Sequence, residues 1–231
     1  MAKKQIGIVP QEFNFNVFEK VEDVLIHQAG YYGIPIGLAR QRAVYYLEKL
    51  GIADKQHVQM RMLSGGMKRR LMIARALIHE PRVLILDEPT AGVDIEMRRS
   101  MYEFLRETNE EGRTIILTTH YLEEAEMLCR NVAIINHGKI VTEGSIKDLL
   151  RDLNSETFLL DTQDALPSGI EVPGFALRQV EPQCLEVDLA KGQDLAQVFT
   201  ALSGAGVTVV SMRNKENRLE RMFVNVLKGA S

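Results

Sequence analysis

Apolar and polar positions along the chain follow two alternating patterns. Short unbroken apolar runs occupy residues 6–9, 83–86 and 114–118, and such runs predict strands buried on both faces of a parallel sheet. Between the runs, apolar residues recur at steps of three and four, which predicts helices. These helical segments cover residues 21–32, 38–50, 64–78 and 95–109. Strands that alternate with helices indicate an α/β fold with parallel core strands.

The pattern changes in the second half of the chain. A short helix at 122–128 precedes two strands, 131–135 and 139–142, and Asn136-His137-Gly138 between them is typical of a hairpin turn. Ser145 is the expected cap of a helix that reaches about Leu153. Beyond it, the expected elements are strands at 156–161, 185–189 and 207–211 and helices at 194–202 and 217–227. This second part predicts a small α+β module.

We place the domain boundary near Asn154, with one domain over 1–154 and an accessory domain over 155–231. The last helix has apolar residues at three- and four-residue steps, which are Leu219, Met222, Phe223, Val226 and Leu227. We expect them to seat this helix on the module's sheet or on a second copy of the module.

Composition narrows the class of protein. The 231 residues carry 28 basic and 31 acidic side chains, and a net charge of −3 gives no electrostatic case for nucleic-acid binding. Cys129 and Cys184 lie far apart in the sequence, and we interpret them as free thiols in a reducing compartment. No apolar run reaches the ~18 residues of a membrane span. We therefore expect a cytoplasmic protein that meets a membrane only through a partner.

The apolar run at 83–86 is followed directly by Asp87 and Glu88. This is the Walker B pattern, in which a buried strand brings carboxylates to the end of a sheet where α/β proteins bind ligands. Asp87 suits a Mg²⁺ ion, and Glu88 suits polarising the water that attacks a γ-phosphate. The alternative is an ordinary strand followed by an acidic turn.

A second candidate lies about twenty residues earlier, at Ser64-Gly65-Gly66. Ser64 is a plausible N-cap, and the two glycines leave backbone N–H groups open to an anion at a helix N-terminus. The alternative is a plain loop before a helix, with the basic run 68–70 on a solvated face.

These motifs occur together and in order. LSGGM stands at 63–67, LILDEPTAGVD at 84–94 and TTH at 118–120, and the chain resembles the ATP-binding cassette (ABC) ATPase family over about 5–150. Residues 9–12 resemble that family's Q-loop. The stretch most resembles the ATPase subunits of bacterial ABC-2 type exporters. The resemblance implies a partial P-loop NTPase core with a helical subdomain, followed by the α+β module.

The resemblance also implies roles for individual residues. Gln11 is expected to contact Mg²⁺ and the attacking water, Asp87 to hold the metal, and Glu88 to be the general base. His120 is expected to contact the γ-phosphate. Ser64, Gly65 and Gly66 are expected to contact the γ-phosphate of a nucleotide held by the other subunit of a dimer, and Asp94 to communicate across that dimer.

The implied cofactors are ATP and Mg²⁺. The implied partners are an ABC-2 type transmembrane permease, at the inner face of the cell membrane, and a second cassette, which is either another copy or a complete cassette. The stretch between Gln11 and Ser64 is expected to face the permease. The apolar face of 21–32 and the Tyr45-Tyr46 pair either form its docking groove or belong to the core of a helical subdomain.

The family's P-loop, G-x-x-x-x-G-K-[ST], does not occur in this sequence, and Gly138-Lys139 follows the Walker B strand and continues with Ile140. We therefore interpret the chain as the downstream part of a cassette, whose strand at 83–86 is less covered than in the family. We expect it to be inactive alone. The alternatives are a non-catalytic fragment that only binds partner subunits and a soluble non-transport ABC protein.

Overall fold

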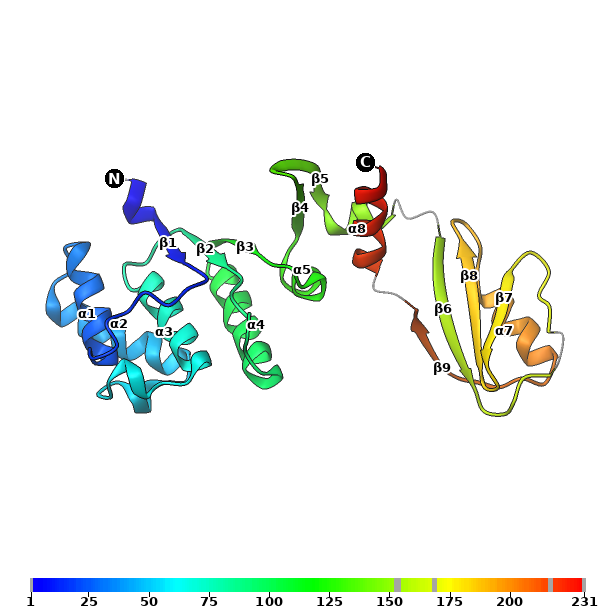
Figure 1. The fold of residues 1–231 in the computed structure, drawn as a ribbon, viewed down its shortest axis with the longest axis horizontal. Helices are drawn as coiled ribbons and strands as arrows, with labels where there is room; N and C mark the ends of the chain where they lie inside the picture. The colour runs from blue at the N-terminus through cyan, green and yellow to red at the C-terminus, as the bar shows by residue number, and fades with distance from the viewer. Residues whose placement is uncertain (1, 152–154, 168–169, 216–217, 230–231) are drawn as a thin grey trace. The chain divides into compact units, whose positions relative to one another are not determined.

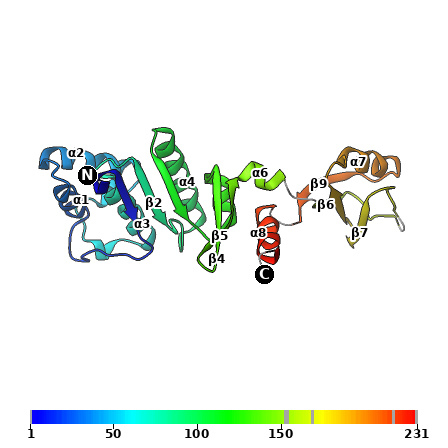
Figure 2. The same ribbon diagram turned by 90° about the horizontal axis from the view of Figure 1, so that it is seen from above.

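The computed structural model describes residues 2–151, 155–167, 170–215 and 218–229. The chain forms two compact units, residues 1–121 and 122–231, which are drawn in Figures 1 and 2. Over the described residues, no helix combines the length and the apolar character that a membrane span needs. The sequence-based boundary near Asn154 and the helix end at Leu153 lie outside the described residues, and that boundary stays a prediction.

The first unit combines one parallel sheet with a group of helices. The sheet has the order β1-β2-β3, with β1 at Ile6–Val9, β2 at Val83–Asp87 and β3 at Thr114–Thr118. The helices are α1 (Val21–Tyr31), α2 (Ile36–Lys49), α3 (Gly65–Leu77) and α4 (Ile95–Glu110), with short 3-10 helices η1 (Ala2–Gln5), η2 (Ala53–Lys55) and η3 (Met60–Met62). The predicted strands and helices of this half are confirmed, and α2 begins two residues earlier than expected.

The two faces of this sheet differ in burial. Gly7 pairs with Leu84, and α3 lies against this face so closely that a Cβ on Gly7 would come within 2.5 Å of the Ala76 carbonyl oxygen. On the opposite face Ile8, Ile85 and Ile116 form one cross-strand row, in which Ile8 is 59% and Ile116 53% exposed. The prediction that the strands 6–9 and 114–118 are buried on both faces is therefore wrong, because one face of this sheet stays exposed among the described residues.

Helices α1, α2 and α3 pack on one another around a common core. Val21, Val24 and Leu25 of α1 and Tyr46 of α2 are buried in it. The apolar face of α1 therefore belongs to the core of a helical subdomain, which was the second of the two interpretations of the sequence. It does not form a docking groove. Tyr45 is exposed, with its ring edge against Tyr46.

The second unit begins with α5 (Leu122–Leu128) and an antiparallel hairpin of β4 (Asn131–Asn136) and β5 (Lys139–Ser145). His137 and Gly138 both have positive φ, as a tight hairpin turn requires. Helix α6 (Ile146–Arg151) follows, and the Ser145 hydroxyl accepts a hydrogen bond from the Asp148 N–H, which confirms the predicted cap.

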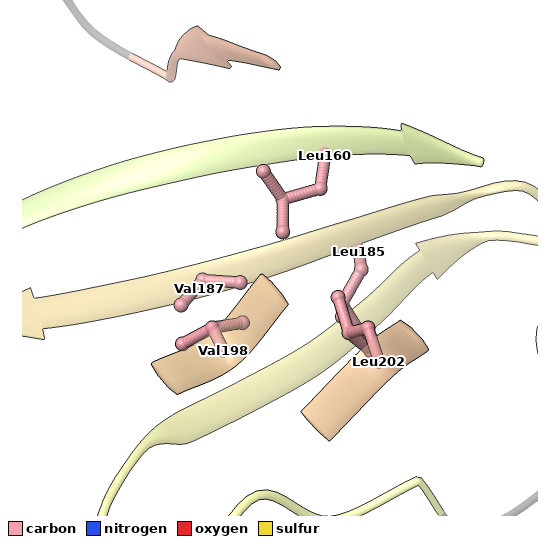
Figure 3. Close-up of a cluster of buried hydrophobic side chains, with 5 residues drawn as sticks. All are labelled: Leu160, Leu185, Val187, Val198 and Leu202. Carbon is pink, nitrogen blue, oxygen red and sulfur yellow. The ribbon is translucent and has the colours of Figure 1, made fainter. Parts of the chain in front are cut away.

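A four-stranded antiparallel sheet of order β7-β8-β6-β9 completes this unit together with α7 (Leu195–Gly204). Its strands are β6 (Ser155–Thr162), β7 (Ala176–Glu181), β8 (Cys184–Ala190) and β9 (Val209–Asn214). Figure 3 shows the buried cluster between sheet and helix, made of Leu160, Leu185, Val187, Val198 and Leu202. Strand β7 was not predicted, because five of its six residues are exposed and it lacks an apolar alternation.

Helix α8 (Arg218–Gly229) ends the described chain and packs on α5, α6 and β5. Leu219 and Met222 form a buried cluster with Ile134 and Ile146. The expectation that this helix sits on the module's own sheet is therefore wrong, because its apolar side chains pack against the hairpin and the helices α5 and α6. The side chain of Leu227 lies outside the described residues.

Candidate functional site

Glu88 stands at the carboxyl end of β2 and connects three elements of the sheet. Its Oε2 accepts a hydrogen bond from Gln11 Nε2 at 2.9 Å, and its Oε1 lies 3.0 Å from His120 Nδ1. Gln11 follows β1 and His120 follows β3. Parallel strands end at one edge of the sheet. Gln11 and His120 therefore both reach the Glu88 carboxylate, although they are 109 positions apart in the sequence.

The backbone of Glu88 turns sharply at this edge, with φ of 45°. Its N–H donates to the carbonyl oxygen of Thr118 at 3.1 Å, so the turn is tied to the end of β3. A left-handed conformation is unfavourable for a residue with a Cβ, and such strain collects at functional sites. The turn carries the Glu88 side chain toward Gln11 and His120.

Asp87 is held by the neighbouring strand. The two residues Asp87 and Thr118 are paired in the parallel register, and the Thr118 hydroxyl donates to Asp87 Oδ1 at 2.5 Å. Sequence reasoning gave Thr118 no role, although the register of two adjacent strands would have indicated it. Over the described residues, no three His, Cys, Asp or Glu side chains gather as a metal cluster.

The other sequence-predicted residues form a second group at the starts of α3 and α4. Ser64 caps α3 by accepting from the Met67 N–H at 3.3 Å, and Asp94 caps α4 by accepting from the Met97 N–H at 2.8 Å. A Cβ on Gly66 would lie 1.9 Å from Met97 Sδ, so Gly66 lets the two helices approach. Ser64 and Asp94 thus each have a structural role as an N-cap, and a role in binding would be additional to it.

Gly65 differs from Gly66. A Cβ on Gly65 would meet no heavy atom within 4 Å beyond its chain neighbours and the backbone of its own helix. Packing among the described residues therefore gives no reason for a glycine at position 65. Open space in front of the first N–H groups of a helix is what an approaching anion needs.

The basic run beside these glycines does not lie on a solvated face. Arg69 is only 3% exposed, and its guanidinium donates to the carbonyl oxygens of Pro10 and Gln11 at 2.8 and 2.9 Å. The sequence-based interpretation of this run is wrong for Arg69. No pattern in the sequence pointed to this contact, because it joins positions 58 and 59 residues apart.

The chain is similar in sequence to several known proteins. A family profile described as "ABC transporter" matches residues 1–91. The linearmycin resistance ATP-binding protein LnrL of Bacillus subtilis is 34% identical over 97% of this chain and 75% of its own length. The Nod factor export ATP-binding protein I of Burkholderia pseudomallei is 42% identical over 77% of this chain, which spans 59% of that relative.

Solved structures give the same answer. An ATP-binding subunit of an ABC transporter matches with a TM-score of 0.59 and 27% identity, over 64% of this chain and 62% of that one. The cbiO1 protein of Clostridium perfringens, part of the ABC transporter complex cbiONQ, matches with a TM-score of 0.56 and 32% identity, over 66% and 64%. The chain belongs to the ATP-binding proteins of the ABC transporter family.

Proposed function

We propose that the chain acts as an ATP-binding subunit of an ABC-2 type exporter, in which ATP hydrolysis drives transport through a separate membrane permease at the inner face of the cell membrane. The observation that carries this proposal is the meeting of Gln11, Glu88 and His120 at one edge of a parallel sheet. The names of two relatives, one for Nod factor export and one for resistance to linearmycin, support an export role.

In this proposal Glu88 is the general base. A carboxylate accepts a proton from the attacking water, and the Gln11 amide and the His120 ring hold its two oxygens in a fixed direction. His120 also contacts the γ-phosphate. One N–H of the Gln11 amide donates to Glu88, and the amide oxygen remains for a metal ion or water.

The residues present at this edge of the sheet fit the Mg²⁺ ion that accompanies ATP. Asp87 supplies a hard anionic oxygen, Gln11 a neutral oxygen, and the Thr118 hydroxyl occupies one Asp87 oxygen while the other remains for the ion. A Mg²⁺ ion held there would supply positive charge beside the phosphates. Asp87 and Gln11 would hold the ion, and Thr118 fixes the direction of the Asp87 carboxylate.

Ser64, Gly65 and Gly66 contact the γ-phosphate of a nucleotide on a second cassette, and Asp94 communicates with that cassette. The open space at Gly65 supports this role. Because this sequence contains no G-x-x-x-x-G-K-[ST], we propose that the 231-residue chain alone does not hydrolyse ATP and pairs with a cassette that carries the motif. Residues 1–154 form the ATPase part and 155–231 an accessory domain.

The permease docks, in this proposal, on the segment after Gln11 and not on the buried face of α1. Phe13, Phe18 and Tyr31 are exposed, with Tyr31 at 87%. Tyr31 lines a groove of about 200 Å³, and Phe13 and Phe18 are neighbours in sequence of other residues that line it. The lining residues are Asn14, Phe15, Asn16, Glu19, Val24, His27, Gln28, Tyr31 and Arg75. Exposed aromatic side chains beside a groove are typical of a docking surface for another protein.

The pairing is tested by sedimentation of the chain with a complete ABC cassette and a non-hydrolysable ATP analogue. We expect nucleotide-dependent association, and we expect Gly65→Arg to abolish it because the added side chain fills the space for the phosphate. Gly37→Arg is the matched control, since Gly37 also has open space around its Cβ position and lies on α2. Equal association of both variants would reject the role of Gly65.

The general base is tested in a chain extended by a relative's G-x-x-x-x-G-K-[ST] segment. Glu88→Gln should bind ATP and lose phosphate release by about 10²-fold or more, because an amide cannot accept the proton. Glu103→Gln on the exposed side of α4 is the control. Steady ATP turnover by the unextended chain would overturn the proposal that it is inactive alone.

A further inference from the structure

Arg69 is a buried cation in the second turn of α3. Within the described part of the chain its side chain forms no ion pair, and it donates instead to two consecutive backbone carbonyl oxygens, those of Pro10 and Gln11. The guanidinium carbon also lies 5.3 Å from the centre of the Phe13 ring. Arg69 thus contacts the segment around Gln11 at the residue before it, at Gln11 itself and at Phe13 after it.

Such an arrangement carries a cost. Burial lowers the pKa of the Arg69 guanidinium, while the charges of Asp87 and Glu88 act in the opposite direction. Its Nε is buried and has no hydrogen-bond partner among the described residues. Burying a charge is unfavourable unless its contacts compensate, so a buried Arg that is not fully satisfied indicates a requirement for its position.

We propose that Arg69 is a positioning residue, which fixes the backbone at Pro10 and Gln11 so that the Gln11 amide reaches the Glu88 carboxylate. The planar guanidinium fork matches two adjacent carbonyls, whereas a lysine carries its three N–H donors on one nitrogen atom and lacks that fork. The general-base role of Glu88 belongs to the proposed function, on which the catalytic meaning of this inference rests. The positioning itself rests on geometry in this chain alone.

The same contact joins the two groups of site residues. Arg69 lies on α3, whose first residues are Gly65 and Gly66, and Gln11 lies in the group around Glu88. The Arg69 side chain thus links the helix that begins at Gly65 to the backbone of Gln11.

The test compares Arg69→Lys with Arg70→Lys in the 231-residue chain. Arg70 is the matched control because it stands next in the same helix and also donates two hydrogen bonds, to Leu50 O at 2.9 Å and Ser100 Oγ at 2.8 Å. Neither of those acceptors belongs to the site. Thermal melting of both variants measures the structural cost that any lost arginine contact imposes.

The decisive measurement is the side-chain amide signal of Gln11 in a nitrogen–proton correlation spectrum, assigned with Gln11→Asn. In Arg69→Lys, we expect this signal to move to the position of an exposed glutamine and its protons to exchange about three- to tenfold faster, because the hydrogen bond to a charged acceptor is lost. Arg70→Lys should leave the signal in place.

An unchanged Gln11 signal in folded Arg69→Lys would overturn the proposal, and so would an equal change in Arg70→Lys. Should Arg69→Lys fail to fold, Arg69→Gln, which retains one donor group, gives the same comparison. This measurement needs no nucleotide. A catalytic failure of Glu88 and a failure of positioning by Arg69 are therefore told apart.

Discussion

The helices of the first unit and its three-stranded sheet differ in how completely their apolar side chains are buried. Leu25, Leu47 and Leu77, one on each of α1, α2 and α3, are completely buried. On the sheet, Ile8 and Ile116 expose more than half of their surface on the same face. The helices thus enclose a fully buried core, whereas the candidate chemistry lies at the edge of a sheet that is buried on one face and open on the other.

The largest expected effect comes from the helical core. Leu47→Ala should lower the free energy of unfolding by about 2–5 kcal/mol, the sum of lost transfer energy and a cavity in a closely packed interior. Urea unfolding followed by helical circular dichroism measures it. Leu38→Ala on the same helix, where the side chain is 41% exposed, is the control and should cost far less. Equal costs would remove the distinction between the two regions.

A smaller loss is expected where the two helix starts meet. Gly66→Ala should destabilise the chain by about 1–3 kcal/mol, because the new methyl group overlaps Met97 and overpacking forces the neighbours to shift. Gly65→Ala should be stability-neutral or slightly stabilising, since its surroundings are open and alanine favours a helix. Thermal melting compares the two. A cost at Gly65 equal to that at Gly66 would contradict the open space seen there.

Prediction from the sequence succeeded where local pattern decides the structure. The strands at 6–9 and 83–86 and the N-cap at Ser64 follow from apolar runs and capping chemistry, and the structure contains them. The sequence motifs also named Gln11, Glu88 and His120, which the structure brings into contact. Their site roles stay predictions.

Long-range packing decided what could not be predicted. Three contacts join elements that are distant in sequence, and a single sequence does not record such pairings. They are the hydrogen bond from Arg69 to Gln11, the close packing of Met97 on Gly66, and the packing of α8 on the hairpin region. The exposure of Ile116 depends on how many layers cover the sheet, and an apolar run gives no information on that number. The same reasoning explains why strand β7, which is mostly exposed, escaped detection.

The next effect is a pH dependence that belongs to the helical side. Burial raises the pKa of Tyr46 to about 12, against the opposing charge of Arg113. The neutral phenol is thus favoured in the folded chain, so this stability is fully present below pH 10 and is lost as the pH rises toward 12. The loss should reach at most about 2–3 kcal/mol, since the pKa rises from 10.0 to about 12 and one pKa unit corresponds to about 1.4 kcal/mol.

Urea titrations at several pH values between neutral and alkaline measure this loss. Tyr46→Phe should remove the part of the slope that Tyr46 contributes, whereas Leu38→Ala, an uncharged change at an exposed position of the same helix, should keep the slope. Identical slopes in both variants would show that burial in the helical core does not control the alkaline stability.

The smallest effect is expected on the open face of the sheet. Ile116→Thr keeps a β-branched side chain on strand β3 and removes apolar surface that is already half exposed, so the free energy of unfolding should change by about 0.5 kcal/mol or less. Leu84→Thr is the control on the opposite face, where Leu84 is completely buried, and it should be strongly destabilising because its hydroxyl would be buried as well. Urea unfolding of both variants gives the ratio of the two costs. If Ile116→Thr destabilises the chain as much as Leu84→Thr, the row of isoleucines is covered in solution, and the contrast between a closed helical core and an open sheet does not hold.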